Sequence, residues 1–167
     1  MNELKYTKKD IDDLLLEEKN FKGDEYKFLI SKCEPIIDIP DITKSNEEWE
    51  NNWKRGSQKL RDTGQQCVCC GRPVNDRVMF HMVMGGGCMG SKKDNLLFTL
   101  FDGGDMWLYP IGSVCAKKLT KEVLKPLGLK PRDYFYGVDY VAKYEKNPDY
   151  LGIDDLPEKY RLSSKLK

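Results

Sequence analysis

The apolar residues at the start of the chain have mainly helical spacing. Ile11 and Leu14 lie on one face of a helix, and Thr7 with Asp10 precedes them as a helix cap with an acidic residue in the first turn. This pattern predicts an amphipathic helix of about three turns. The apolar residues within 26–31 are compatible with a second helix or with a strand, because a short apolar run does not reveal its period.

A further helical signal starts at position 45. Ser45 and Glu48 have the form of a capping box, in which the serine caps the helix and the glutamate reaches back to it. Trp49 and Trp53 follow four residues apart on one helical face. We expect that face to be buried rather than to stack on a partner. Together these features predict a helix over 46–63.

The middle of the chain has the pattern of β-strands. Residues 77–84 form a predicted strand in which His81 faces away from Phe80. The apolar run 96–101 predicts a second strand. The Asp-Gly-Gly-Asp sequence that follows it predicts a tight turn into a third strand over 106–109.

A last helix is predicted over 113–124, with Ser113 as its cap. Helices followed by strands and then by a helix indicate an α+β fold. We divide the chain into an acidic helical N-terminal region (1–63), a central module (64–128) and a C-terminal region (129–167). The C-terminal region is rich in tyrosine and ends in a basic tail, and we expect it to wrap over the core.

Composition narrows the class of protein. Hydrophobic residues make up 40% of the 167 residues, which is enough for a core. The sequence contains no apolar run of membrane-spanning length, and its first residues do not resemble a secretory signal. We therefore expect a cytoplasmic protein without membrane contact, whose six cysteines are thiols or metal ligands rather than disulfides.

The net charge of +1 is unevenly distributed. Residues 1–50 contain 8 lysines and 14 acidic residues, whereas residues 51–167 contain 20 basic and 13 acidic residues. The basic part can attract phosphate groups, and the acidic part can repel them or pair with a basic surface. Two ordinary solvated surfaces would give the same distribution.

The cysteines carry the clearest chemical signal. Cys67 and Cys70 are separated by two residues and followed by Gly71, which is the form of a tight turn that supplies two ligands to zinc. Cys115 lies in the first turn of a predicted helix, where the helix dipole favours the thiolate that binds metal. The sequence therefore predicts a Zn²⁺ site.

The fourth zinc ligand is open between three residues. His81 is the only histidine of the chain, and we place it first because it follows the cysteine pair on a strand. Cys88 lies in a glycine-rich loop that can bend toward the metal, and Cys69 lies between the paired cysteines. The predicted set is therefore Cys67, Cys70, His81 and Cys115.

The stretch 67–119 resembles a treble-clef zinc finger. The sequences Cys70-Gly71-Arg72-Pro73 and Ile111-Gly112-Ser113-Val114-Cys115-Ala116-Lys117-Lys118-Leu119 are similar to those of small proteins carried by bacteriophages and mobile elements. The resemblance implies a knuckle, a β-hairpin and a helix around one metal ion. It also implies a protein that works in the cytoplasm of a host cell. The chain departs from the usual treble clef because its helix has one cysteine instead of two.

A zinc ion with four protein ligands holds structure and does not activate water. We therefore expect a non-catalytic module that binds a host protein or a nucleic acid, and the sequence does not fix its oligomeric state. Basic residues beside the cysteine pair are candidates for phosphate contact. They are Lys54, Arg55, Lys59, Arg61, Arg72 and Arg77.

Two other functions remain open. The first is an inhibitor of a host defence nuclease, comparable to an anti-CRISPR protein, that docks through the acidic N-terminal region. The second is a metal-dependent nuclease, which would need a histidine base and a separate site for a hard metal. Asp94, Asp102 and Asp105 are the carboxylates available for such a site.

Overall fold

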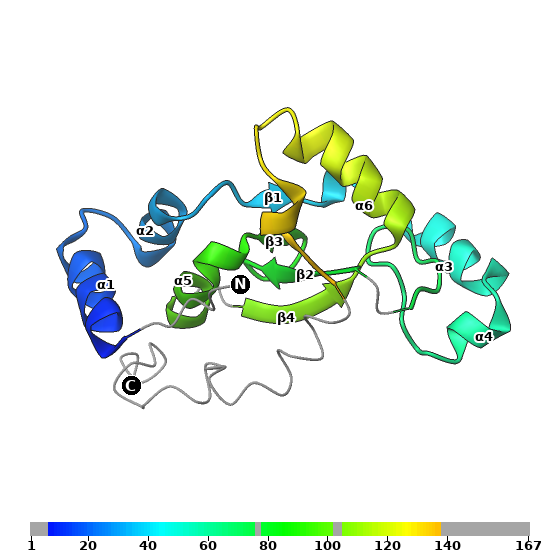
Figure 1. Ribbon diagram of the computed structural model, residues 1–167, viewed down its shortest axis with the longest axis horizontal. Helices are drawn as coiled ribbons and strands as arrows, with labels where there is room; N and C mark the ends of the chain where they lie inside the picture. Colours follow the sequence, from blue (N-terminus) through cyan, green and yellow to red (C-terminus); the bar gives the residue numbers. More distant parts are fainter. Residues whose placement is uncertain (1–6, 76–77, 102–104, 138–167) are drawn as a thin grey trace.

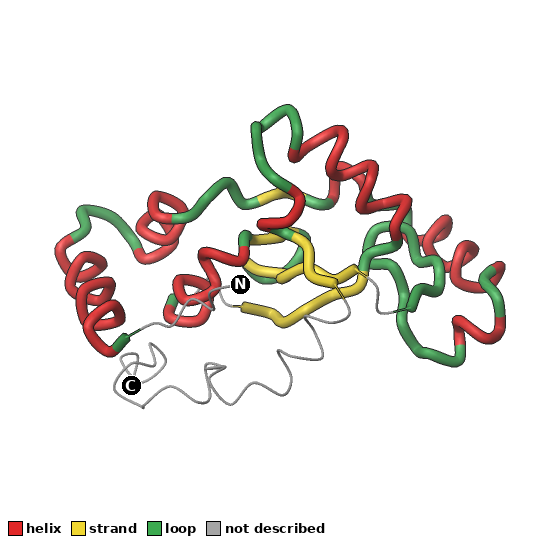
Figure 2. Tube along the Cα trace, in the orientation of Figure 1, coloured by secondary structure: helices red, strands yellow, loops and turns green. Residues whose placement is uncertain are grey.

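The computed structural model describes residues 7–75, 78–101 and 105–137, and these form a mixed α+β structure. An antiparallel sheet occupies the middle of the molecule, with helices at both ends and one long helix over the sheet (Figure 1). Figure 2 shows the same arrangement by type of element. The helices are α1 (Lys8–Asn20), α2 (Glu25–Lys32), α3 (Asn46–Arg55), α4 (Gln58–Arg61), α5 (Asn95–Leu100) and α6 (Ser113–Leu119).

The sheet is built around its longest inner strand, β2. Its order is β1-β3-β2-β4, and β5 pairs with a separate part of β2. All pairs are antiparallel, with Met82 opposite Met89 of β3 and Phe80 opposite Tyr109 of β4. The strands are β1 (Ile37–Asp38), β2 (Val78–Val83), β3 (Cys88–Gly90), β4 (Asp105–Pro110) and β5 (Phe135–Gly137).

The two faces of β2 belong to two hydrophobic clusters. Phe80 and Met82 pack in one cluster with Leu119 of α6 and with the cysteine-rich loop. Val83 packs in the other cluster, which α1, α2 and α5 complete with Phe28 and Phe98 among others. Because successive side chains of a strand point to opposite faces, one strand supports both clusters.

Several sequence predictions are confirmed. Thr7 and Asp10 form a capping box at the start of α1. The segment 26–31, which the sequence left open between a helix and a strand, is helical and lies within α2. The predicted strands over 77–84 and 106–109 correspond to β2 and β4.

The prediction of a strand over 96–101 is wrong, because this segment forms α5. Leu97, Phe98 and Leu100 are all buried, and an apolar run this short does not distinguish a buried helix from a buried strand. The helix predicted over 46–63 is also divided. Its first part, α3, ends at Arg55 with Gly56 as the C-cap residue. Ser57 then caps the short α4 by accepting a hydrogen bond from the Leu60 N–H at 3.3 Å.

The last helix begins where the sequence predicts, although Gly112 rather than Ser113 is its cap residue. It continues from α6 into a π-helical turn over Thr120–Leu124. Of the tyrosines predicted to cover the core, Tyr134 and Tyr136 are buried. The others beyond residue 137 lie outside the described residues.

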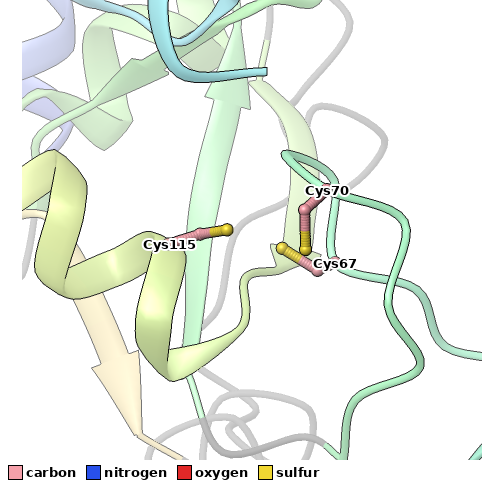
Figure 3. A group of neighbouring side chains, drawn as sticks. All are labelled: Cys67, Cys70 and Cys115. Atoms are coloured by element: carbon pink, nitrogen blue, oxygen red, sulfur yellow. The ribbon is translucent and has the colours of Figure 1, made fainter. Parts of the chain in front are cut away.

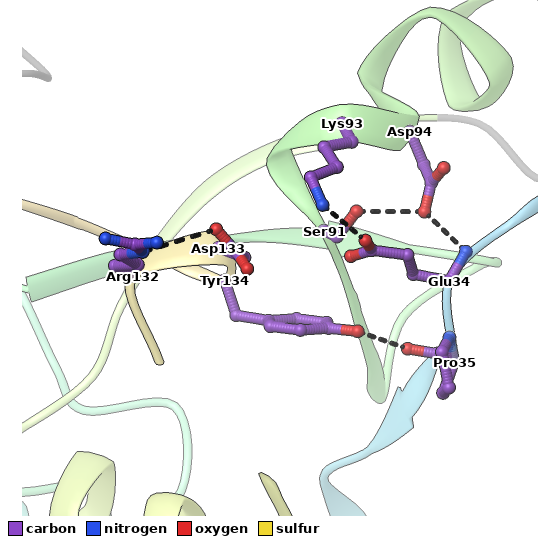
Figure 4. A network of polar contacts seen from close by, with 8 residues as sticks. All are labelled: Glu34, Pro35, Ser91, Lys93, Asp94, Arg132, Asp133 and Tyr134. Atoms are coloured by element: carbon purple, nitrogen blue, oxygen red, sulfur yellow. Dashed lines mark hydrogen bonds and ion pairs between the residues drawn. The ribbon is translucent and has the colours of Figure 1, made fainter. Parts of the chain in front are cut away.

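A polar network connects the segment before β1 to the segment before β5 (Figure 4). The Tyr134 hydroxyl donates to the carbonyl of Pro35 at 2.9 Å. Asp94 accepts from the Ser91 hydroxyl and from the Glu34 N–H, both at 2.9 Å. The bond from the Glu34 N–H spans 60 positions in sequence and the bond from the Tyr134 hydroxyl spans 99, so both join distant parts of the chain.

Candidate metal centre

Three cysteine thiols from two separate segments meet beside the sheet. The Sγ atoms of Cys67, Cys70 and Cys115 all lie within 4.8 Å of one another. Figure 3 shows Cys115 projecting from α6 toward the other two. Within residues 7–75, 78–101 and 105–137 this is the group of His, Cys, Asp or Glu side chains that can hold a metal ion. All three cysteines are free of disulfides.

The first two thiols lie on a tight loop, residues 67–71, which we call the knuckle loop. Its ends are closed by two backbone hydrogen bonds of 2.8 Å, from the Gly71 N–H to the Cys67 carbonyl and from the Cys67 N–H to the Arg72 carbonyl. Gly71 has a φ of +76°, which glycine adopts at little cost. The Val68 N–H donates to the Pro110 carbonyl at 3.0 Å, so the loop is attached to the end of β4.

Backbone N–H groups also donate to the sulfurs. The Gly112 N–H donates to Cys67 and the Arg72 N–H to Cys70. Such bonds stabilise thiolates, because they bring the positive end of the N–H dipole to the charged atom. Cys115 lies in the first turn of α6, where the helix dipole has the same effect.

Helix α3 and the residue before its cap hold the carbonyls of the knuckle loop. The Trp49 indole N–H donates to the Cys67 carbonyl at 3.2 Å, and the Asn52 side-chain amide to the Cys70 carbonyl at 2.8 Å. The Lys44 N–H donates to the Cys69 carbonyl at 2.7 Å. Trp49 and Trp53 are half-buried on this helix, so the expected burial of the tryptophan face is partial.

Contacts between the thiols shift their pKa values in opposite directions. Hydrogen bonds from Cys115, Cys69 and Cys70, in that order of strength, hold the pKa of Cys67 well below its ordinary value. The same contacts raise the pKa of Cys70, through Cys115 and Cys67. They also raise the pKa of Cys115, through Cys67 and Cys69.

Cys69 lies on the knuckle loop beside this group, although its Sγ atom is not among those that lie within 4.8 Å of one another. Its thiol is hydrogen-bonded with those of Cys115 and Cys67, and the residue is fully buried. The hydrogen bond with Cys115 lowers the pKa of Cys69, but the bond with Cys67 and burial raise it to about 12. The sequence offered a signal for this contact, since three of four consecutive positions beginning at Cys67 are cysteine.

The other two candidates for the fourth ligand lie elsewhere. His81 is buried on β2 and makes an edge-to-face contact with Tyr136, with 4.9 Å between ring centroids. It is not part of the three-thiol group. Cys88 lies on β3 and packs against the other hydrophobic cluster, and it is also outside the group.

The predicted basic residues lie mostly on one end of the molecule. Lys54, Arg55, Lys59 and Arg72 are exposed on α3, α4 and the segment after the knuckle loop. Arg61 is half-buried, and its guanidinium donates to the Lys54 carbonyl at 2.9 Å and to Gln58 at 2.6 Å. Arg77 lies outside the described residues.

Exposed lysines on α6 were not singled out from the sequence. Lys117 and Lys118 on α6, and Lys121 in the turn that follows, are solvent-exposed. Residues 117 and 121 have the four-residue spacing of one helical face, which is the signal that could have identified them. They lie on the helix that carries Cys115, across the thiol group from the knuckle loop.

The carboxylates considered for a second metal are not gathered into a site by the described residues. Asp94 is buried and accepts two hydrogen bonds within the network of Figure 4, and burial raises its pKa. Asp102 lies outside the described residues, and so does the side chain of Asp105.

Comparison of the chain with protein-family models, with curated proteins and with solved structures finds no match. Among the helices described, none has the length and apolar character needed to cross a membrane.

Proposed function

We propose that Cys67, Cys70 and Cys115 bind a structural zinc ion and that the protein is a non-catalytic binding module. The observation that carries this proposal is the convergence of three thiols, within 4.8 Å of one another, from a loop and a helix that are far apart in sequence. Zinc takes sulfur ligands at about 2.3 Å in a tetrahedron, which places the sulfurs about 3.8 Å apart. The thiol group needs little rearrangement to reach that geometry.

The zinc ion would attach α6 to the knuckle loop. The cluster beneath it contains few large side chains from the loop itself, so the metal would supply part of the folding free energy of this region. The arrangement of loop, strands and helix is the support for the proposed kinship with treble-clef fingers. The proposed kinship with small proteins of bacteriophages and mobile elements rests on the sequence resemblance alone.

Nucleic acid is the partner that the charges favour. Exposed basic residues lie on both elements that the zinc ion would join, namely Lys54, Arg55, Lys59 and Arg72 on one side and Lys117, Lys118 and Lys121 on the other. Their side chains can neutralise phosphates, and metal binding would fix the relative position of the two sets.

Binding of fluorescent duplex DNA and single-stranded RNA, measured as anisotropy across a salt series, tests this proposal. We expect the affinity to fall with salt, and the double variant Lys59→Ala/Arg72→Ala to lower the slope of log K against log salt by about 2. A matched control, Lys19→Ala/Lys27→Ala in the N-terminal region, should leave the slope unchanged. No binding at low salt, or an equal effect of both double variants, would refute a role for this surface.

A second candidate partner is a basic protein, for which α1 and α2 give a specific observation. Leu16, Tyr26 and Ile30 are 58%, 60% and 44% exposed, and exposed carboxylates such as those of Asp12 and Asp13 lie on α1. Exposed apolar residues beside acidic ones suit a basic partner groove, as in the proposed inhibitor of a host defence nuclease.

A tagged pull-down from a bacterial lysate, with and without added nuclease, separates the two candidates. Capture of one basic protein that survives nuclease and is lost in the Tyr26→Ala/Ile30→Ala variant favours the inhibitor. Capture that disappears with nuclease favours nucleic acid.

A further inference from the structure

Two leucines fix the inner side of α6 and of the π-helical turn that continues it. Leu119 and Leu124 are both fully buried in the hydrophobic cluster that contains the knuckle loop. In an α-helix, residues five apart would lie about 140° from each other around the axis. The π-helical turn removes most of this difference, because its hydrogen bonds join residues five apart, as from the Lys125 N–H to the Thr120 carbonyl at 2.9 Å. One side of the whole helix therefore stays on the core.

The opposite side of this helix is exposed and basic. Val114 is 72% exposed and marks the middle of that side. With 3.6 residues per turn, Lys117 lies about 60° to one side of Val114 and Lys118 about 40° to the other. Exposed lysines at four-residue spacing continue along the helix. We call the four exposed lysines of this side the lysine stripe: Lys117, Lys118, Lys121 and Lys125.

The composition around the lysine stripe limits what it can bind. Residues 113–130 contain five lysines and one acidic residue, Glu122, which forms an ion pair with Lys118 at 4.0 Å. The same residues include no aromatic side chain and no Arg, Asn or Gln. The surface therefore offers positive charge without the aromatic platforms on which single strands stack. It also lacks the forked or amide side chains that most often read base edges.

Resting on the proposed nucleic-acid function, we propose that the lysine stripe binds duplex DNA, with α6 in the major groove and without reading its sequence. The major groove of B-DNA is about 12 Å wide and admits an α-helix, which is about 10–12 Å across. The deep, narrow major groove of duplex RNA does not admit one. Lys117 and Lys118 diverge toward the phosphates on the two sides of the groove, and contacts to phosphates carry no sequence information.

Fluorescence anisotropy of the full-length protein with duplex DNA, duplex RNA and single-stranded DNA of one length tests this inference. We expect duplex DNA to bind most tightly. The triple variant Lys117→Ala/Lys121→Ala/Lys125→Ala should lower the slope of log K against log salt on duplex DNA by about 2.7, since each phosphate contact contributes about 0.9. The matched control Lys19→Ala/Lys22→Ala/Lys27→Ala removes the same charge from exposed positions near the N-terminus and should leave the slope unchanged.

Glu122→Gln tests the stripe in the opposite direction. Loss of this carboxylate releases Lys118 from its ion pair, so the slope on duplex DNA should rise by about 0.9 and binding at low salt should become tighter. A variant that merely damaged the fold would not strengthen binding. Unchanged or weaker binding of Glu122→Gln overturns the inference.

The remaining outcomes separate this inference from the proposed function. Duplex RNA or single-stranded DNA that binds as tightly as duplex DNA overturns the inference, and so does a triple variant that behaves like its control. Two duplex DNA sequences that differ by more than about fivefold in affinity, which is the discrimination that reading one base pair gives, also overturn it. If no probe binds at low salt, the nucleic-acid function itself fails. A slope lowered by Lys59→Ala/Arg72→Ala but not by the triple variant keeps that function and rejects only the role of α6.

Discussion

The contact between α3 and the knuckle loop predicts an unequal response of two glycines to the same substitution. Gly71 has a φ of +76° and Gly64 a φ of +70°, so alanine is equally strained by the backbone at both positions. They differ in space. A Cβ atom on Gly71 would lie 2.2 Å from the Trp49 carbonyl oxygen, whereas a Cβ atom on Gly64 meets nothing within 4 Å.

The free energies follow from this difference. The left-handed conformation costs alanine about 1–2 kcal/mol at either site, and part of this is offset by the smaller entropy of the unfolded chain. At Gly71, α3 must also move away. Overpacking of this kind costs about 1–3 kcal/mol, and the hydrogen bonds of Trp49 and Asn52 to the loop contribute about 1 kcal/mol each. We expect Gly71→Ala to be about 2–4 kcal/mol less stable than Gly64→Ala.

Urea unfolding of both variants at one fixed zinc concentration measures this difference. A chelator competition should also show weaker zinc binding in Gly71→Ala, because the displaced loop no longer presents its thiols to Cys115. Equal stability of the two variants within about 0.5 kcal/mol, which is the size of ordinary surface effects, would refute the described contact between α3 and the loop.

Three further predictions follow from the site and the polar network. Tyr134→Phe should lower the free energy of unfolding by about 1–2 kcal/mol, because the Pro35 carbonyl loses its 2.9 Å hydrogen bond; urea unfolding without a measurable loss would contradict this. A chelator should lower Tm and helical circular dichroism, since zinc binding contributes to folding, and an unchanged Tm would argue against a structural metal. Contacts between the thiols raise the pKa values of Cys70 and Cys115, and zinc takes thiolates as ligands. Zinc binding should therefore release protons and become weaker as pH falls. Calorimetry in buffers of different ionisation enthalpy measures this release, and a value near zero would contradict it.

The sequence predicted the parts of the site that depend on local spacing. The separation of Cys67 and Cys70 and the helix around Cys115 are local features, and the structure brings these three thiols together. The way in which α3 holds the knuckle loop could not be predicted, because no local pattern reports hydrogen bonds that reach 18 residues along the chain. His81, predicted as the fourth ligand, lies outside the three-thiol group.

The fold shows the same division between local and distant causes. Capping signals located the starts of α1 and α3, because a cap is formed by residues three positions apart. The apolar segment 96–101 was assigned to a strand because a short apolar run does not reveal its period. Its helix depends on distant packing, since Leu97 and Phe98 are buried in one cluster with Phe28 of α2.

Metal analysis of the full-length protein, purified without chelators, tests the central claim most directly. The account predicts about one equivalent of zinc, which is lost in Cys67→Ser and in Cys115→Ser but retained in Cys33→Ser, whose thiol lies in the other hydrophobic cluster. A protein that folds without zinc and takes up none, or zinc that persists at full occupancy when both Cys67 and Cys115 are replaced, would contradict it.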